Sequence, residues 1–249
     1  MLSTFIIIFS FFYIFCHFQE ESFREQQKKY SRVRIAYDEK YELLTNNLEA
    51  VGISNFNMEI FIRVFKQEQI LEVWVRDKDT PQFVSFKEFG ICRISGEPGP
   101  KRRQWDFQIP EGFYRITHFN PTSNSYLSLG INYPNRSDRI LSYQPAPGGD
   151  IYIHGSCVTI GCIPLTDDKI KELYVLAVEA RTNGQDEIMV HIYPSKLKGA
   201  SWDNLTDSYC DREDLLHFWN QLKTGYDYFE LYRQLPNVSV ASNGDYIFR

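Results

Sequence analysis

Residues 150–168 read DIYIHGSCVTIGCIPLTDD, and the interpretation of the whole chain starts from them. A short apolar strand ends at His154, a loop that contains Gly155 and Gly161 follows, and Cys162 comes eight residues after the histidine. A loop of this length can bring an imidazole and a thiol within hydrogen-bond reach, about 2.6–3.2 Å and somewhat longer for sulfur. A neighbouring histidine lowers the pKa of a thiol and then carries its proton. The spacing therefore indicates a Cys–His pair for nucleophilic catalysis.

The loop between the two residues has features that suit acyl transfer. Gly161 places no side chain beside the nucleophile, and the backbone amides of the TIGC turn (159–162) can face a tetrahedral oxyanion. Such donors contribute about 2–4 kcal/mol of transition-state stabilisation. Gly155, Thr159 and Gly161 are therefore the candidate loop and oxyanion positions. Thr159 either braces the loop or is an exposed hydroxyl.

Three other interpretations of these residues stay open at the level of sequence. His154 and Cys162 can be core residues, since cysteine is among the residue types most often buried. His154, Cys157 and Cys162 are zinc-ligand types, but a structural site needs a fourth ligand, from His118 or His191, and no second CxxC exists. Cys157 can instead form a disulfide with Cys162, pack as a small apolar residue, or act as a second thiol. We expect no metal and no cofactor.

Composition excludes several classes of protein. The 249 residues are 43% hydrophobic and 24% charged, with 27 Lys and Arg against 32 Asp and Glu, a net charge of −5. A mildly acidic chain without basic blocks is a poor candidate for binding nucleic acid. The motifs HExxH, GxxxxGK[ST], GxGxxG and GxSxG are absent, which removes the commonest metalloprotease, nucleotide-binding and serine-hydrolase signals.

The N-terminus carries an apolar run, FIIIFSFFYIF at 5–15. It is shorter than the roughly 20 residues that span a bilayer as a helix, and it matches the apolar region of a signal peptide. Cys16 closes the run in the place of a lipoprotein cysteine, although the bulky Phe15 precedes it. We expect residues 1–18 to be a signal peptide or a membrane anchor, and the alternative is a buried strand or helix.

The rest of the chain predicts a mainly β domain with flanking helices. Apolar residues at spacings of three and four predict a helix over 31–51, a second over 166–184 and a third over about 211–233. Period-two alternation between turn signals predicts strands over 58–65, 70–75, 82–94, 112–119, 126–131, 151–154 and 188–193, and a last strand or hairpin after Pro236. The predicted units are a helical segment over 19–57, a catalytic domain over 58–199 and a helical extension over 200–249 packed on it.

The run IHGSCVTIGCIPLTDDKI (153–170) resembles the active-site segment of the YkuD family of L,D-transpeptidases, and more closely its YafK-type branch. The likeness extends to RVFKQEQILEVWV, ICRISGEPGPKRR, PEGFYRI, FNPTSNSYLSLGINYPN, GQDEIMVHIYP and FWNQLKTGYDYF, and so covers roughly residues 31–247. The resemblance implies a β-rich YkuD-type domain that acts on peptidoglycan stem peptides in the bacterial periplasm.

Matched position by position, the resemblance makes Cys162 the nucleophile and His154 the proton donor and acceptor, with a backbone carbonyl orienting the imidazole. The thiolate would form a thioester with the stem peptide and pass it to an amine of another stem or of an envelope lipoprotein. Ile160 stands where the family has histidine, and Pro164 where it has arginine or asparagine. An amidase that releases lipoprotein from peptidoglycan is therefore an alternative, as is a non-catalytic peptidoglycan-binding module. We favour transpeptidation.

The remaining charged and titratable candidates are weaker. Residues 101–103, Lys-Arg-Arg, either hold a substrate carboxylate or form an exposed charge run, which is the simpler interpretation. His118 fits a surface imidazole. His191 alternates with Ile188, Val190 and Ile192, so we expect it to point to the other face of its strand. His217 shares a polar, solvated helix face with Glu213 and Asn220.

Overall fold

The computed structural model describes residues 21–143 and 146–249. The apolar run at 5–15 and the predicted signal peptide or anchor at 1–18 lie outside these residues. Within the described part of the chain, no helix is long and apolar enough to cross a membrane.

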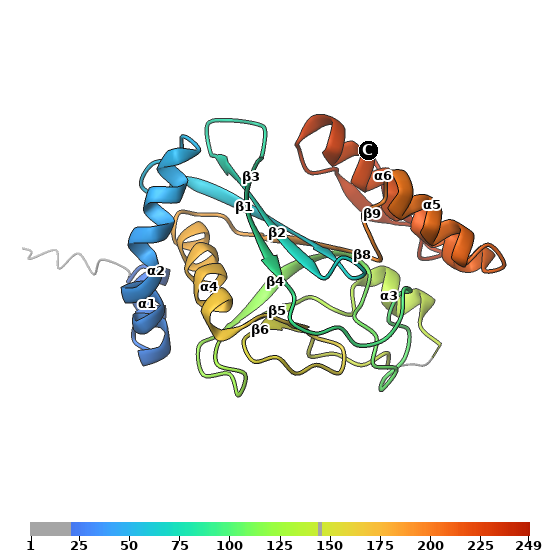
Figure 1. The fold of residues 1–249 in the computed structure, drawn as a ribbon, viewed down its shortest axis with the longest axis horizontal. Coiled ribbons are helices and arrows are strands. Elements are labelled where there is room, and N and C mark those ends of the chain that lie inside the picture. Colours follow the sequence, from blue (N-terminus) through green and yellow to red (C-terminus); the bar gives the residue numbers. More distant parts are fainter. Residues whose placement is uncertain (1–20, 144–145) are drawn as a thin grey trace, which may run out of the picture.

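One sheet of eight strands organises the molecule (Figure 1). Its spatial order is β3-β2-β1-β8-β4-β5-β6-β7, and the strands are β1 (Met58–Phe65), β2 (Ile70–Asp77), β3 (Val84–Gly90), β4 (Gly112–Asn120), β5 (Ser128–Ile131), β6 (Tyr152–His154), β7 (Ile163–Pro164) and β8 (Met189–Tyr193). Most neighbours are antiparallel, but β1 pairs with β8 and β6 with β7 in parallel. The short strands β6 and β7 therefore lie together at one edge of the sheet.

The centre of the sheet is buried on both faces. On β1, Ile60 and Ile62 belong to one apolar core, while Phe61 and Phe65 belong to clusters on the opposite side. Successive side chains of a strand point to opposite faces, so a strand covered on both sides is apolar throughout, as MEIFIRVF nearly is.

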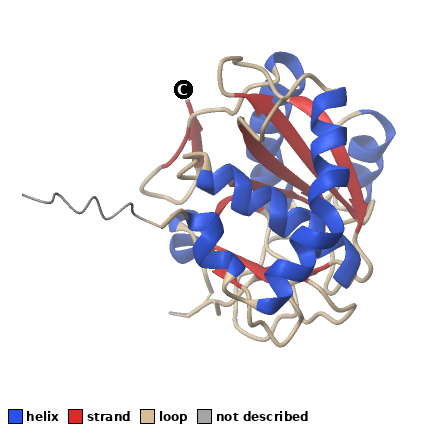
Figure 2. Cartoon of the chain, turned by 90° about the vertical axis from the view of Figure 1, so that its left-hand side faces the viewer, coloured by secondary structure: helices blue, strands red, loops and turns tan. Residues whose placement is uncertain are grey.

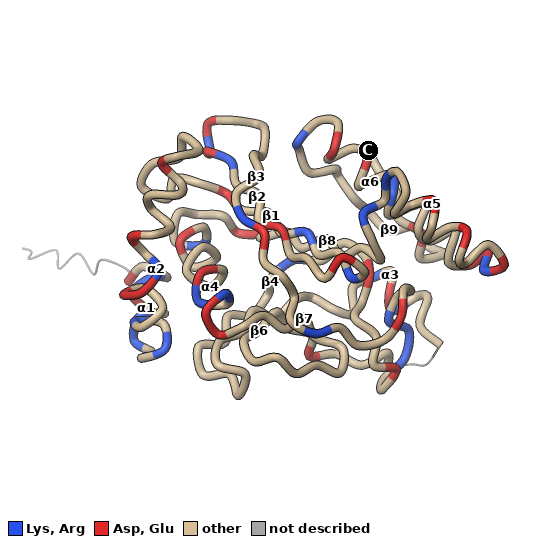
Figure 3. The backbone as a smooth tube through the Cα atoms, viewed as in Figure 1, with Lys and Arg blue, Asp and Glu red and all other residues tan. Residues whose placement is uncertain are grey.

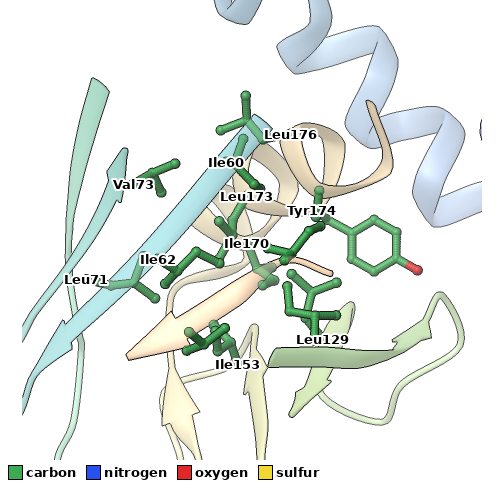
Figure 4. Close-up of a cluster of buried hydrophobic side chains, with 14 of the residues drawn as sticks. Ile60, Ile62, Leu71, Val73, Leu129, Ile153, Ile170, Leu173, Tyr174 and Leu176 are labelled. Atoms are coloured by element: carbon green, nitrogen blue, oxygen red, sulfur yellow. The ribbon is translucent and has the colours of Figure 1, made fainter. Parts of the chain in front are cut away.

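Helices α1 (Phe23–Lys28), α2 (Ser31–Ala50) and α4 (Asp167–Thr182) cover one face (Figures 1 and 2). Helix α4 begins as its sequence predicts, because the side chain of Thr166 caps the amide of Lys169 and acidic residues fill the first turn. Its residues Ile170 and Leu173 pack on Ile62 and Ile153 from the sheet (Figure 4).

The opposite face carries α5 (Gly199–Ser208), α6 (Glu213–Tyr232) and the hairpin β9 (Val238–Val240) and β10 (Tyr246–Phe248). These elements enclose a second apolar cluster around Trp219, Leu222 and Tyr226. The expected last hairpin is thus confirmed. The tail helix begins two residues later than expected, at Glu213.

The mainly β fold with flanking helices is confirmed, but three helices were not predicted individually: α1, α3 (Arg136–Leu141) and α5, of which α1 and α5 fall in segments expected to be helical. Two of them, α1 and α3, are only six residues long, too short for a periodic apolar pattern to show. The predicted strand over 82–94 is wrong at its end, because β3 stops at Gly90.

A buried ion pair anchors the long segment between β3 and β4. The ammonium of Lys66 lies 2.9 Å from the carboxylate of Glu111 and donates to the carbonyls of Glu97 and Gly99. The same carboxylate accepts from the indole N–H of Trp219 at 2.8 Å. Buried charges are tolerated only when paired and hydrogen-bonded, so this network fixes the segment against the sheet. The rest of the charge is spread over the molecule, with acidic and basic residues interspersed (Figure 3).

Candidate functional site

His154 and Cys162 belong to two neighbouring segments at the edge of the sheet. His154 is the last residue of β6, and Cys162 directly precedes β7. The register pairs Ile153 with Ile163, and both of these side chains are buried in the core. Alternation therefore places His154 and Cys162 together on the opposite face. Two residues along the strand and one strand across correspond to about 8 Å between their Cα atoms, a diagonal that an imidazole can bridge.

The imidazole of His154 is held by the backbone. Its Nδ1 lies 2.5 Å from the carbonyl oxygen of Gly155, and a carbonyl only accepts, so Nδ1 carries the proton. Nε2 is then the unprotonated nitrogen that is able to accept a proton. Burial lowers the pKa of His154, and the hydrogen bond to Gly155 offsets part of that shift. The residue is thus set up as a neutral base at neutral pH.

The thiol of Cys162 is also held by backbone groups. Its Sγ accepts from the amide of Tyr152 at 3.4 Å and lies 3.6 Å from the carbonyl oxygen of Asp150. Burial raises the pKa of this thiol, while the Tyr152 amide works in the opposite direction. The resting state is therefore a neutral thiol, which needs a base before it can act as a nucleophile.

Imidazole and thiol do not hydrogen-bond each other in this structure, although the spacing predicts that they can. Each is engaged with its own backbone partner, the imidazole with Gly155 and the thiol with Asp150 and Tyr152. Catalytic hydrogen bonds are often long or poorly aligned without substrate and tighten when it binds.

The loop that connects them is braced from within. The hydroxyl of Thr159 donates to the carbonyl of Cys162 at 2.7 Å and accepts from the amide of Gly161 at 3.1 Å. Gly161 has φ +138°, and a Cβ there would lie 3.1 Å from the carbonyl oxygen of Gln108. The position therefore requires glycine for its conformation and for space. Because the Gly161 amide is already used by Thr159, it is not a free oxyanion donor, which corrects the expectation for that amide.

Gly155 begins the same loop in a crowded place. Its amide donates to the carbonyl of Leu127, and a Cβ at this position would lie 2.6 Å from a carboxylate oxygen of Asp167. That carboxylate accepts from the amide of Ser156. The helix-start carboxylate thus also secures the beginning of the loop.

A disulfide joins Cys157, in the middle of the loop, to Cys92. The pairing of Cys157 with Cys162 that sequence left open is wrong, and so are the packed apolar cysteine and the second free thiol. The amide of Cys92 donates to the carbonyl of Pro164, so the disulfide partner is itself fixed against β7. Sequence gave no signal for this pairing, because 65 residues separate the two cysteines. Among the described cysteines, Cys162 and Cys210 are free.

A pocket of about 250 Å³ opens at the thiol; we call it the thiol pocket. Its walls are formed by the segment after β3, the turn before β6 and the loop itself: Lys101, Gln104, Trp105, Gly148, Gly149, Asp150, Ile151, Ile160, Gly161 and Cys162. Trp105 is 69% exposed and Ile160 63% exposed, so the rim is apolar. Trp105 was not singled out by sequence, because it comes from a distant segment, whereas Lys101 belongs to the run that sequence offered as a holder of a substrate carboxylate.

The predicted exposed charge run at 101–103 is wrong for two of its members. Lys101 is buried and donates to Asp106 at 2.5 Å, and Arg102 is buried and donates to Asp138 at 3.1 Å. These pairs leave Arg103 as the exposed residue of the three. The cause is the anchored segment, which folds the run back onto α3.

The other histidines lie away from the thiol pocket. His118 is exposed, as expected, and its ring lies 6.3 Å from that of Tyr152. His191 is buried between aromatic rings, and burial lowers its pKa to about 3. His217 contacts Asp245 on the surface of α6. In residues 21–143 and 146–249, no group of three or more His, Cys, Asp or Glu is arranged to hold a metal ion, and the disulfide removes Cys157 from the possible zinc ligands.

Comparison with known proteins assigns the chain to a family. The profile of the YkuD family, described as the L,D-transpeptidase catalytic domain, matches residues 59–194. The Escherichia coli (strain K12) protein YafK, whose name assigns it provisionally to the L,D-transpeptidases, is 38% identical over 190 residues, which cover 76% of this chain and 73% of that protein.

Solved structures give weaker similarities. The helical cell shape determining protein Pgp2 from Campylobacter jejuni has a TM-score of 0.43 at 18% identity and covers 80% of each chain. Bd1075 from Bdellovibrio bacteriovorus has a TM-score of 0.38 at 20% identity, covering 69% of this chain and 62% of that one. The assignment depends on the profile and on the 38% identity: the chain belongs to the YkuD family of L,D-transpeptidase catalytic domains.

Proposed function

We propose that this protein is a peptidoglycan L,D-transpeptidase in which Cys162 is the nucleophile and His154 the proton carrier. The observation that carries the proposal is the placement of a free cysteine in a pocket, on the same face of the sheet as a histidine with one free ring nitrogen. Membership of the family supports the proposed reaction class, and the geometry supports the proposed roles of the two residues.

In the first step, Nε2 of His154 takes the proton of the Cys162 thiol. The sulfur then attacks the carbonyl carbon that follows the L-centre of the diamino acid in a stem peptide. The C–N bond breaks, the imidazolium returns its proton to the leaving amine, and the following D-residue departs. The product is a thioester between the stem peptide and Cys162.

In the second step, an amine attacks the thioester. His154 takes the proton of the incoming amine, the new amide bond forms, and the thiol is regenerated when the imidazolium returns that proton to sulfur. The acceptor is the amine of another stem peptide or of an envelope lipoprotein. When water takes the place of the amine, the same residues catalyse hydrolysis.

The negative charge that develops on the carbonyl oxygen of the substrate needs a hydrogen-bond donor. The amide of Gly161 is engaged by Thr159, whereas the amide of Cys162 donates to no other group of the described chain. We assign the Cys162 amide to the oxyanion, with Thr159 and Gly161 shaping the turn that presents it.

The disulfide supports an envelope location. Disulfides persist in oxidising compartments such as the bacterial periplasm and are rare in the cytosol. Cys92 and Cys157 are joined, while the thiol that the chemistry needs is left free. The location therefore agrees with an action on peptidoglycan after export.

The test offers the full chain and its Cys162→Ala variant two substrates separately: tetrapeptide-containing muropeptides with a labelled D-amino acid, and peptidoglycan bearing attached lipoprotein. Products are weighed by mass spectrometry. Exchange of the terminal D-residue or new cross-linked dimers, made only by the unmodified protein, support the transpeptidase. Release of lipoprotein with net addition of water identifies the amidase instead. Equal products from both proteins would exclude Cys162 as the nucleophile.

A further inference from the structure

A second pocket of the described chain is larger than the thiol pocket. This pocket, of about 610 Å³, lies between the segment after β3, the end of α3, the start of α6 and the turn between β9 and β10. We call it the α3–α6 pocket. It is more than twice as large as the thiol pocket and shares no lining residue with it. Its volume is in the range of sites that bind small molecules.

One loop separates the two pockets. Lys101 and Trp105 line the thiol pocket, while Arg102 and Arg103 line the α3–α6 pocket. The carboxylate of Asp106 accepts from the amides of Arg102 and Arg103, both at 3.0 Å, and so fixes this loop. A polymer that leaves the thiol pocket across the loop therefore enters the α3–α6 pocket.

The charges of the α3–α6 pocket are balanced. Its three arginines are matched by three aspartates: Arg102, Arg103, Arg212, Asp106, Asp214 and Asp245. Arg212 and Asp214 already form two hydrogen bonds, at 3.0 and 2.8 Å. Such a surface has no strong potential of either sign, so it favours a neutral ligand over a polyanion or a highly charged peptide. Guanidinium donors beside carboxylate acceptors suit a ligand rich in hydroxyl and amide groups.

Apolar side chains complete the wall. Leu215 and Phe218 from α6 line the pocket, and Tyr143 stands at its edge with 72% of its surface exposed. Sugar rings present C–H faces to apolar and aromatic surfaces while their hydroxyl and acetamido groups point sideways to polar partners. The pocket offers both kinds of partner.

The polar groups are also held in place before any ligand binds. The side chain of Gln221 donates to Asp245 at 2.8 Å and accepts from the amide of Tyr246 at 2.7 Å. His217 contacts the same Asp245. Preorganised groups lose little freedom on binding, which favours affinity for a weakly interacting neutral ligand.

We propose that the α3–α6 pocket binds the N-acetylated sugar units of the glycan strand to which the stem peptide is attached. The inference rests on the proposed function for the identity of the polymer. The enzyme then prefers glycan-attached stem peptides over free peptides, because the sugar contacts contribute to binding while the peptide occupies the thiol pocket.

A binding experiment tests this independently of catalysis. The full chain carrying Cys162→Ala is titrated calorimetrically with a peptide-free tetrasaccharide of N-acetylglucosamine. We expect saturable binding of the tetrasaccharide. Arg103→Ala and Arg212→Ala should each lower the affinity about tenfold, because each removes a hydrogen bond from a charged donor. Both side chains are exposed, so the variants should fold. Arg139→Ala, an exposed arginine of α3 outside both pockets, is the matched control and should bind normally.

Kinetics supply the second readout. With a disaccharide-tetrapeptide as donor, Arg103→Ala should raise KM about tenfold and leave kcat unchanged, whereas with the sugar-free tetrapeptide both constants should stay unchanged. Absence of saturable tetrasaccharide binding, or an equal rise in KM for both donors, would overturn the inference. Saturable binding without any acyl transfer would refute the proposed chemistry while supporting the sugar site.

Discussion

Among the described residues two histidines are buried in the sheet, and we propose a chemical role for only one of them. His154 at the end of β6 is 6% exposed, and His191 in the middle of β8 is 1% exposed. Burial lowers the pKa of both, to about 3 for His191. Burial and a shifted pKa therefore do not distinguish them.

The residues around the two imidazoles distinguish them. The ring of His191 lies between Phe61 and Phe113, with both ring centroids 4.6 Å away, and its Nδ1 faces the hydroxyl of Tyr193. It is part of an aromatic core. In the ring of His154 one nitrogen contacts a backbone carbonyl, and the other has no hydrogen-bond partner among the described residues and lies on the face that carries Cys162. His154 thus combines a fixed orientation with a ring nitrogen that is available to the proposed chemistry.

The largest expected effect separates the two cysteines that are free in the described part of the chain. Replacing Cys162 by Ala removes the nucleophile and should lower turnover about a thousandfold or more. Cys210, exposed just after α5, is the matched control, and Cys210→Ala should leave turnover unchanged. Steady-state release of the terminal D-residue measures both. A large loss in Cys210→Ala would contradict the assignment.

The histidines themselves give the next effect. His154→Gln removes the proton carrier and should lower kcat by roughly a hundredfold to ten-thousandfold, with the fold retained. His191→Gln should leave kcat close to normal but lower the free energy of unfolding by about 1–3 kcal/mol, since it disturbs a buried hydrogen bond and aromatic packing. Turnover and urea unfolding are measured on both variants. The comparison fails when His191→Gln, still folded, loses as much activity as His154→Gln.

The disulfide offers a way to loosen one region only. The loop between His154 and Cys162 has little apolar packing, because four of its side chains are exposed: Ser156, Cys157, Val158 and Ile160. The disulfide to Cys92 is therefore an important restraint on this loop. The double variant Cys92→Ala/Cys157→Ala should lose about 2–4 kcal/mol of stability. It should also lose about tenfold in kcat, because small displacements of catalytic groups are costly.

Mild reduction of the unmodified protein, followed by thiol counting, serves as the control for the double variant. Reduction should reproduce its loss of kcat reversibly. Full activity in a protein shown to lack the Cys92–Cys157 disulfide would mean that activity does not depend on this restraint of the loop.

The smallest effect concerns pH. In the proposed mechanism His154 is a neutral base, and its pKa lies below the ordinary histidine value of about 6.5. Activity should therefore persist below pH 6.5 and fall only as the pH passes through the lowered pKa of the imidazole. The pH profile of kcat/KM measures this. An acid limb centred above about pH 6.5 would indicate that the histidine is stabilised in its charged form.

Stability responds to acid through the other histidine. The pKa of His191 is about 3 in the folded protein against about 6.5 when unfolded. Its contribution is fully present above pH 6.5 and is lost as the pH falls towards 3, because the unfolded chain binds the proton first. His191→Gln should accordingly flatten the decline of unfolding free energy between pH 6.5 and 3.

Much of the fold could be predicted from the sequence, in segments where an apolar pattern or a capping residue marks a strand or helix. Alternation along 58–65 and 188–193 predicts β1 and β8, and the cap at Thr166 predicts the start of α4. Cys162 and His154 could be proposed as a pair because they are eight residues apart and match the family's active-site segment.

What sequence could not supply depends on long-range contacts. Cys92 joins Cys157 across 65 residues, and Lys101 and Arg102 are buried because the segment that contains them folds onto Asp106 and Asp138. Nothing in the local composition of KRR distinguishes a buried paired lysine from an exposed one. The same fold-back creates the wall between the two pockets, which is therefore invisible before the structure.

The central claim is that Cys162 carries the stem peptide as a thioester, and the most direct measurement is the mass of the intact protein after acid quenching of a reaction with a tetrapeptide donor. We expect a mass increase equal to the donor lacking its terminal D-residue, located on the peptide that contains Cys162 and absent from Cys162→Ala. An acyl group on any other residue, or turnover of the donor by Cys162→Ala at the unmodified rate, would contradict it.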